Sequence, residues 1–206
     1  MSHSLKQEIE EIAKEKAPGP SAAFSIPQIL RALELIAEKP TGRNMLAQKL
    51  AVGEGVARTI ISRLKTAELI NASKAGCALT SKGSKVWHDY QSIVKTVSIE
   101  KNEIARNDFN VAILVRDKAL KLKSGIEQRD AAVVAGAGNA TSMVIREDRL
   151  VIPLVSNDVS RDFPRAAKQL ISFLAPKNGD VIIVVGADSS GKALYGATAA
   201  AWVLLD

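Results

Sequence analysis

The sequence predicts an α+β protein in which helices and strands are unevenly distributed. Through most of the N-terminal half, apolar residues recur at helical spacing, with one short ribbon among them. In the C-terminal half, apolar runs of strand length alternate with helical segments. Hydrophobic residues make up 47% of the 206 residues, which is enough to form true cores. The length suits one large or two small domains, and we place a boundary between residues 97 and 98.

The N-terminal half begins with three expected helices. A charged amphipathic helix runs from Ser4 to Lys16 and is followed by the turn-prone segment Ala17–Ser21. The helix Pro27–Glu38 has proline in its first turn, where a missing N–H costs little. A shorter helix, Asn44–Ala51, can be capped by Thr41. Its expected buried residues are Met45, Leu46 and Leu50.

A turn with two glycines, Val52–Gly55, leads into a further helix that has two unlike faces. At about 100° per residue, its apolar side chains fall within one arc of about 140°, which is the expected buried face. These residues are Val56, Ala57, Ile60, Ile61 and Leu64. The opposite face is polar and must point to something outside the core. It contains Gly55, Arg58, Ser62 and Thr66, with Thr59 and Lys65 beside them and Arg63 at the edge.

A short ribbon is expected after this helix. The runs Ile70–Ser73 and Cys77–Thr80 flank Lys74-Ala75-Gly76, and a three-residue loop ending in glycine is a common hairpin geometry. Thr80 is placed to cap the next helix, which runs from Ser81 to about Val94. Helix, turn, helix and ribbon in this order describe a winged helix-turn-helix over roughly residues 24–95.

The excess positive charge of the chain is concentrated in this motif. Residues 41–86 contain eight basic and two acidic residues, a net charge of +6 that equals the net charge of the whole protein. A basic patch confined to a helix-turn-helix is the electrostatic footprint of a duplex-binding protein. An ordinary solvated, basic surface is the alternative. We therefore predict double-stranded DNA as the partner, contacted by Arg43, Gly55, Arg58, Thr59, Ser62, Arg63, Lys65 and Lys74.

Roles can be assigned to some of these side chains. Arg58 can form two hydrogen bonds to a guanine edge, and Thr59 and Ser62 can reach bases or phosphates. Arg63 and Lys65 lie off the centre of the face and suit phosphates better. Lys74, at the tip of the ribbon, can reach a flanking phosphate.

Two segments resemble known families. The Leu46…Leu50 spacing, the Ile60…Leu64…Leu69-Ile70 pattern and the Leu79-Thr80…Gly83 ending resemble the winged-helix DNA-binding domains of prokaryotic transcriptional regulators. This resemblance implies a DNA-binding transcriptional regulator, although some winged helices are protein-interaction modules instead. The segment Gly125–Asp130 resembles a domain of unknown function attached to winged helices in archaeal predicted regulators, which implies no particular ligand or activity.

The C-terminal half is expected to form an α/β sandwich of two or three layers. The expected strands are Asn110–Arg116, Thr141–Arg146, Leu150–Leu154 and Val181–Val185. The expected helices are Gly125–Ala135, Asp162–Leu174 and Ser189–Leu205. Residues 98–108 can serve as the junction between the two domains. The β-branched stretch Ile93–Ile99 favours a strand at this point.

The segment Gly186–Lys192 reads GxxxxGK between a strand and a helix, which is the context of a phosphate-binding P-loop. Two features oppose nucleotide hydrolysis: Ala193 stands where magnesium needs Ser or Thr, and no later strand can carry a metal-binding aspartate. We therefore expect no enzyme, and keep a nucleotide- or phosphate-binding enzyme as an alternative. A plain strand-to-helix turn is the simplest interpretation of these glycines.

A second glycine-rich loop, Gly136–Asn139, follows the helix that contains Arg129 and Asp130. Because ligand sites favour strand ends, a small anionic effector could bind between the two loops. The residues proposed for it are Arg129, Asp130, Asn139, Thr141, Ser189, Ser190 and Lys192. A structural or surface ion pair is the commoner role for neighbouring Arg and Asp residues.

Composition argues against several other classes of protein. The single cysteine, Cys77, fits a reducing cytosol, and Cys77, His3 and His88 match no metal-ligand spacing, so we expect neither metal nor cofactor. The longest uncharged run, Ala131–Ile145, has 15 residues, short of the about 18 that a membrane helix needs. We expect a cytoplasmic protein. It should be a homodimer, because regulators commonly read repeated half-sites as twofold dimers.

Overall fold

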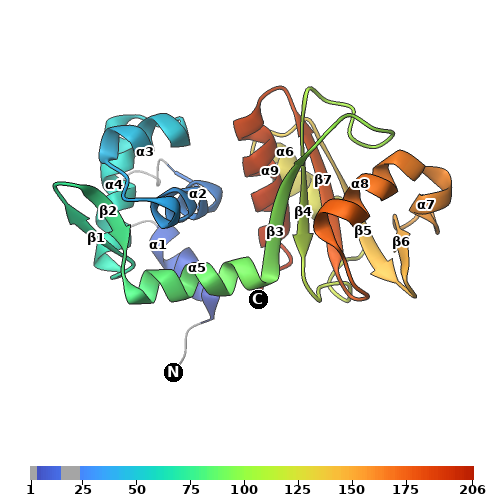
Figure 1. The fold of residues 1–206 in the computed structure, drawn as a ribbon, viewed down its shortest axis with the longest axis horizontal. Coiled ribbons are helices and arrows are strands. Elements are labelled where there is room, and N and C mark those ends of the chain that lie inside the picture. Colours follow the sequence, from blue (N-terminus) through green and yellow to red (C-terminus); the bar gives the residue numbers. More distant parts are fainter. Residues whose placement is uncertain (1–3, 15–23) are drawn as a thin grey trace. The chain divides into compact units, whose positions relative to one another are not determined.

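The computed structural model describes residues 4–14 and 24–206. The described chain divides into two compact units, the first ending at Gln91 and the second spanning Ser92–Leu205 (Figure 1). This division falls earlier than the expected boundary after residue 97, because strand β3 (Val94–Ile99) is hydrogen-bonded into the sheet of the second unit. His3 and the turn expected at Ala17–Ser21 lie outside the described residues.

The first unit contains five helices and a two-stranded ribbon within the described ranges. In chain order these are α1 (Leu5–Ala13), α2 (Ile26–Glu38), α3 (Arg43–Leu50), α4 (Glu54–Thr66), β1 (Ile70–Ser73), β2 (Gly76–Leu79) and α5 (Ser81–Ile93). The core of this unit is aliphatic, and each helix from α1 to α4 contributes to it. Its largest fully buried side chains are Ile9, Ile29, Leu33, Leu46, Leu50, Ile60, Leu64, Leu69 and Ile70. The predicted winged helix-turn-helix is confirmed.

Two local expectations for α3 were wrong. Met45 is 46% exposed rather than buried, because Leu46, Ala47 and Leu50 form the inward face of this short helix. The N-cap residue is Gly42, not Thr41. Thr41 is buried and exchanges backbone hydrogen bonds of 3.0 and 2.9 Å with Cys77. Thr41 therefore forms an isolated antiparallel bridge to strand β2 of the ribbon.

The ribbon is tighter than the sequence suggested. Ser73 pairs directly with Gly76, so the loop consists of Lys74 and Ala75 alone. Gly76 has a φ of +118°, a conformation that residues with a side chain rarely adopt. It also lies against Thr41, since a Cβ at this position would come within 2.9 Å of the Thr41 carbonyl carbon. Glycine is needed here for both reasons.

The start of α5 explains the Leu79-Thr80…Gly83 ending. As predicted, Thr80 caps this helix: its Oγ1 accepts a hydrogen bond of 2.9 Å from the Gly83 N–H. The same hydroxyl donates to the Glu68 carbonyl at 2.6 Å. Gly83 is buried against the Leu69 carbonyl group, and a Cβ would overlap its oxygen. The cap and the glycine together hold α5 against the end of α4.

The second unit is built on a five-stranded sheet of order β3-β4-β7-β5-β6, in which every pair of neighbours is antiparallel (Figure 1). The strands are β3 (Val94–Ile99), β4 (Phe109–Val115), β5 (Asn139–Arg146), β6 (Arg149–Val151) and β7 (Val181–Ala187). The helices are α6 (Ile126–Val134), α7 (Val159–Asp162), α8 (Pro164–Leu174) and α9 (Ser190–Trp202).

Helices cover both faces of this sheet. Leu170 and Leu174 of α8 share a core with Ile182 and Val184 of β7, so α8 covers that face. Val185 points the opposite way, because successive side chains of a strand alternate, and it contacts the position of Gly196 in α9. Helix α6 lies beside α9 on this second face. The predicted α/β sandwich is therefore a three-layer one.

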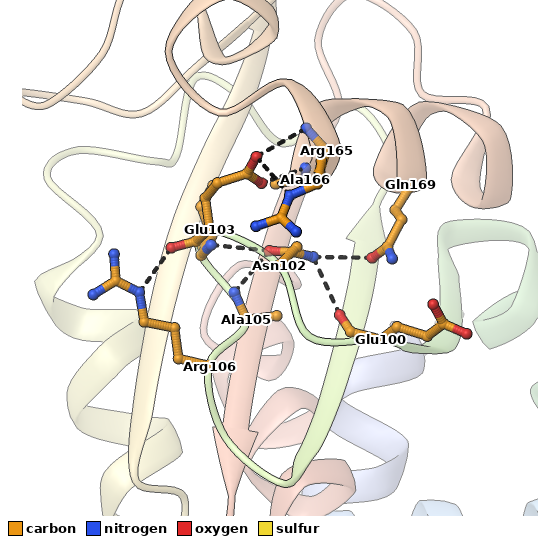
Figure 2. A network of polar contacts seen from close by, with 9 residues as sticks. Glu100, Asn102, Glu103, Ala105, Arg106, Arg165, Ala166 and Gln169 are labelled. Carbon is orange, nitrogen blue, oxygen red and sulfur yellow. Dashed lines mark hydrogen bonds and ion pairs between the residues drawn. The ribbon is translucent and has the colours of Figure 1, made fainter.

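The loop between β3 and β4 is tied to α8 by the polar network in Figure 2. Asn102 Oδ1 accepts hydrogen bonds from the N–H groups of Ile104 and Ala105 at 2.9 and 2.8 Å, and its Nδ2 donates to Gln169 Oε1 at 2.9 Å. The Glu103 carboxylate accepts from the N–H groups of Arg165 and Ala166 in the first turn of α8. Residues 98–108, expected as a junction between domains, thus belong to the second unit.

Glu103 is held in its charged form. Partial burial of its carboxylate raises the pKa, but hydrogen bonds from its own N–H, the N–H groups of Ala166 and Arg165 and the Arg165 side chain outweigh this effect. The net result lowers the pKa of Glu103 from 4.5 to about 2. A negative charge at the N-terminal end of a helix is also favoured by the helix dipole.

Candidate nucleic-acid interface

Helix α4 has the two unlike faces that its sequence predicts. Ala57, Ile60 and Leu64 are buried, while Val56 and Ile61 are half-buried. Glu54 in the first turn and Arg63 and Lys65 in the last turn match the helix dipole. The outward residues are all exposed: Gly55, Arg58, Thr59, Ser62, Lys65 and Thr66. The polar side of α4 is thus open to a partner.

The start of α4 allows close approach. Gly53 is the N-cap and has no side chain with which to cap the helix, and a Cβ at Gly55 would meet nothing within 4 Å. Thr59 Oγ1 donates to the Gly55 carbonyl at 3.0 Å, so this hydroxyl faces a partner mainly as an acceptor. Ser62, one turn further on, is exposed.

A groove of about 430 Å³ lies between α4, the start of α3 and the β1–β2 ribbon. Arg43, Arg58 and Lys74 line it, one from each of these elements. The rest of its lining is Gly42, Ile61, Ala72, Ser73, Ala75, Gly76 and Cys77. Burial raises the pKa of the Cys77 thiol, which keeps it neutral. The groove therefore has a neutral lining apart from three cations.

Several cations around the groove have no partner in the part of the chain that the structure describes. Arg58, Lys65 and Lys74 are exposed, and no hydrogen bond or ion pair joins their side chains to residues 4–14 or 24–206. Arg43 differs, because its guanidinium lies 3.6 Å from the Glu54 carboxylate. Unpaired exposed cations on a rigid helix and ribbon can neutralise phosphates without first breaking an internal ion pair.

Arg63, which the sequence also assigned to DNA, is used inside the first unit. Its guanidinium donates to the carbonyl oxygens of Ile12, at 2.9 Å, and of Lys14. It also lies over the Phe24 ring, 4.9 Å from the centroid. Arg63 thus joins the end of α1 to α4, and we leave it out of the interface proposed below.

Lys82, outside the predicted set, has a similar role. Its Nζ lies 2.8 Å from a Glu8 carboxylate oxygen and donates to the Ala67 carbonyl at 2.9 Å. It therefore connects α1 to the last turn of α4. Two further exposed lysines, Lys49 and Lys85, were not selected from the sequence either. Their charge was visible in the composition, but their position relative to the groove was not.

The two glycine-rich loops of the second unit do meet. The Gly138 N–H donates to the Gly186 carbonyl at 2.8 Å, and Gly136 lies against the Lys192 side chain. Asn139 Nδ2 donates to Asn107 Oδ1 at 2.7 Å. Asn107 was not predicted for this place, and nothing in its local sequence indicates it.

The seven residues proposed for an effector are nevertheless dispersed. Thr141 projects to the same face as Met143, which α8 covers, whereas Lys192 belongs to α9 on the opposite face. Arg129 and Asp130 are exposed on α6 and form an ion pair of 3.0 Å with each other. Lys192 pairs with Asp188 at 2.8 Å. The structure brings Asn139 close to the Gly186 end of the other loop but does not unite the full set.

The GxxxxGK segment does not form a phosphate-cradling loop. Gly186 lies within β7, paired with Asn110 and Asn139, and Gly191 lies within α9. Only Asp188 and Ser189 connect the strand to the helix, and Ser189 Oγ accepts from the Lys192 N–H at 3.4 Å. Gly186 is needed because a Cβ would overlap the Asn107 side chain. The segment is a strand-to-helix turn.

In residues 4–14 and 24–206, no three His, Cys, Asp or Glu side chains come together in a way that would hold a metal ion. Over the same ranges, no helix is both long enough and apolar enough to cross a membrane.

Comparison with known protein families bears on both units. Residues 27–94 match the family model described as the CggR N-terminal DNA binding domain. The first unit is similar to a DNA-binding domain. Residues 106–204 match the model of a domain of unknown function, DUF4443. Both resemblances inferred from the sequence are confirmed, the N-terminal one to a DNA-binding domain and the C-terminal one to a domain of unknown function. None of the curated proteins matches the chain significantly.

Among solved structures, hypothetical protein PH0730 from Pyrococcus horikoshii OT3 is 26% identical, with a TM-score of 0.70. The match covers 88% of this chain and 92% of that chain, so the similarity extends over both units. BusR of S. agalactiae, solved in complex with its busAB-promotor DNA, is 11% identical over 99% of this chain and 98% of that chain. Its TM-score of 0.24 is too low to indicate a shared fold, so it has no bearing on the function.

Proposed function

We propose that this chain is a transcriptional regulator that binds double-stranded DNA through the outward face of α4 and the β1–β2 ribbon. The observation that carries the proposal is the set of exposed, unpaired cations Arg58, Lys65 and Lys74 on a fold similar to a DNA-binding domain. Close approach of the duplex is possible at Gly55, which has no side chain, and the hydroxyl groups of Thr59 and Ser62 are available for hydrogen bonds. Arg43 completes the set at the start of α3.

The positions of the three cations support different roles in DNA binding. Arg58, on the outward face of the helix, suits base edges in a major groove, whereas Lys74 on the ribbon and Lys65 near the end of α4 suit phosphates. Phosphate neutralisation supplies affinity for any duplex, and Arg58 with Ser62 supplies preference for a sequence. A regulator of this kind works where the chromosome is, so a cytoplasmic location is part of the proposal.

The test is duplex binding measured by fluorescence anisotropy, after selection of a preferred site from random sequence. The full chain should bind the selected site more tightly than a scrambled duplex, and both affinities should fall steeply with salt. A chain that binds no duplex even at low salt would instead be a winged-helix protein-interaction module. Lys168→Ala, at an exposed lysine of α8, is a matched control for charge removal and should bind like the wild type.

For the second unit we propose a role in assembly, with the chain acting as a homodimer. An effector site that uses all seven predicted residues has little support, because four of them lie apart in the structure: Arg129, Asp130, Thr141 and Lys192. What remains of that hypothesis is an anion near Asn139, Ser189, Ser190 and Lys192. Titration calorimetry with inorganic phosphate tests it: measurable heat that Lys192→Ala abolishes would restore the effector site.

The proposal assigns no catalytic activity to the chain. Its support is the structure of the Gly186–Lys192 segment, where the first glycine is inside a strand and the last glycine is inside a helix. Nucleotide binding by the wild type, lost in Lys192→Ala, would favour the alternative of a nucleotide- or phosphate-binding enzyme.

A further inference from the structure

Helix α6 has its side chains arranged in the reverse of an ordinary surface helix. Its exposed aliphatic residues are Ile126, Val133 and Val134, which are 52%, 49% and 90% exposed. The residues it buries are Gln128 and Ala132. A surface helix normally turns its aliphatic residues to the core and its polar residues to water. An outward apolar face on a stable helix indicates a contact surface for another molecule.

The order of residues along this face is symmetric. At about 100° per residue, Ile126, Val133 and Asp130 lie near the centre of the outward face, with Arg129 and Val134 on either side. Asp130 is also the midpoint of the helix Ile126–Val134. The outward face therefore has an aliphatic residue at its first turn, the exposed Arg129–Asp130 pair at its middle and two valines at its end.

We propose that this face of α6 is where a second copy of the chain docks, with the two α6 helices antiparallel across a twofold axis that passes between Arg129 and Asp130. In this arrangement, Ile126 of one subunit meets Val133 and Val134 of its partner, and the same contact recurs on the other side of the axis. Arg129 faces Asp130 of the partner subunit, so the central charges are complementary as well. A twofold contact requires a patch that complements itself in this way.

The symmetry of the patch is what favours a second copy over an unrelated protein. An unrelated partner has no need of apolar residues at equal distances on both sides of a central pair of opposite charges. A polar partner such as a nucleic acid would gain no binding free energy from contact with the aliphatic side chain of Val134, which is 90% exposed. The inference rests on the homodimer proposed above and names its contact surface, whereas duplex binding by the first unit does not require any particular dimer contact.

The first test compares two carboxylates introduced at equally exposed aliphatic positions. In sedimentation equilibrium, the full chain should be a dimer, and Val133→Glu should raise its dissociation constant by about 100-fold or more, because each subunit buries an unpaired charge. Ile171→Glu, on α8 at 48% exposure, should leave the dimer unchanged. Circular dichroism melting of both variants shows whether the fold is retained.

The second test exchanges charges. Arg129→Asp and Asp130→Arg should each weaken the dimer, because like charges then meet across the axis, and the double exchange should restore it. If Val133→Glu or either single exchange dimerises like the wild type, or if the double exchange fails to restore the dimer, the α6 interface is overturned. A monomeric wild type overturns it too.

The two proposals can fail separately. Duplex binding with a dimer that Val133→Glu does not disturb leaves the proposed function intact and places the dimer contact elsewhere. A dimer that Val133→Glu dissociates, in a protein that binds no duplex, supports the α6 interface and removes the proposed function.

Discussion

Helices α4 and α6 are both surface helices, yet they show opposite kinds of side chain to the outside. α4 buries Ile60 and Leu64 and exposes Arg58 and Ser62, as an amphipathic helix should. α6 buries Gln128 and exposes Val134. The difference teaches what each helix is suited to contact. A cationic face gains from a polyanion, whereas an aliphatic face gains from another apolar surface that removes it from water.

The largest effect is expected from a substitution that disturbs the packing of α5 against the end of α4 and leaves every charged residue in place. In Gly83→Ala, the added Cβ overlaps the Leu69 carbonyl oxygen, a backbone atom that cannot move aside without shifting the end of α4. We expect the first unit to lose about 3 kcal/mol or more of stability. Duplex binding at 37 °C should be lost, while sedimentation still shows a dimer held by α6. A Gly83→Ala protein that binds DNA normally would mean that α4 does not depend on this packing.

Gly186→Ala is the matched substitution in the second unit. Its Cβ would lie 2.3 Å from Asn107 Oδ1 and 2.9 Å from Asn107 Cβ, so rotation of this side chain relieves only part of the overlap. The loss of stability should still be smaller than for Gly83→Ala, where the added Cβ would lie 1.9 Å from a backbone oxygen. Thermal unfolding followed by circular dichroism compares the two variants directly.

The next effect concerns base preference. Arg58→Ala should weaken binding to the selected duplex by about 10- to 100-fold, because a two-pronged arginine–guanine contact contributes about 1–3 kcal/mol. It should also relax the preference at one base pair. Repeating the site selection with this variant checks both outcomes. A uniform loss across all sequences would place Arg58 on the phosphates instead.

A smaller effect is expected for the ribbon. Lys74→Ala should weaken all duplexes alike and should reduce the slope of log affinity against log salt by about 1. Lys65→Ala should behave in the same way. Anisotropy titrations at four salt concentrations measure the slope, with Lys168→Ala as the control. An unchanged slope in Lys74→Ala would show that the ribbon tip does not reach the duplex.

Arg63→Ala tests whether a cation of α4 that is used inside the first unit also contributes to DNA binding, because Arg63 contacts α1 and Phe24. It should lower the stability of the first unit by about 1–2 kcal/mol, through loss of charge-assisted hydrogen bonds and of the cation–π contact. The salt slope of duplex binding should remain that of the wild type. A slope reduced by about 1, as expected for Lys65→Ala, would return Arg63 to the interface.

The smallest effect is a pH dependence in the second unit. The pKa of Glu103 is lowered from 4.5 to about 2, so its contribution to stability is complete above pH 4.5 and is lost as pH falls towards 2. Glu103→Gln should therefore melt below the wild type at pH 6, and the difference should shrink steadily between pH 4.5 and pH 2.5. Melting curves across this range measure it. A difference that stays constant with pH would show that the carboxylate charge is not what caps α8.

Much of the first unit could be predicted because its signals are local. The two faces of α4 follow from residue spacing alone, and the Thr80 cap follows from a threonine directly before a helix. The hydrogen-bond partners of Arg63 could not be predicted in this way. Its partners are the carbonyl oxygens of Ile12 and Lys14, about fifty residues away in the chain, and carbonyl positions leave no trace in the sequence.

The second unit was harder to predict because its glycines and strand ends depend on distant residues. The stretch Ile93–Ile99 was recognised as strand-forming, but its pairing with β4 makes it part of the second unit. Gly186 resembled the first glycine of a phosphate loop, yet it is required because Asn107 lies over it. The exposed valines of α6 fitted an ordinary helical pattern, and only the folded structure shows that they face outward.

The most direct test of the account is the salt dependence of duplex binding by the full chain and by a triple variant, Arg58→Ala, Lys65→Ala and Lys74→Ala. The wild type should bind duplex DNA with an affinity that falls steeply with salt. The triple variant should bind more weakly and show a slope smaller by about 1.8, since Lys65 and Lys74 each contribute about 0.9 through a phosphate contact and Arg58 contacts a base edge. Wild-type binding that is absent at low salt, or a triple variant with the slope of the wild type, would contradict the assignment of this face to DNA.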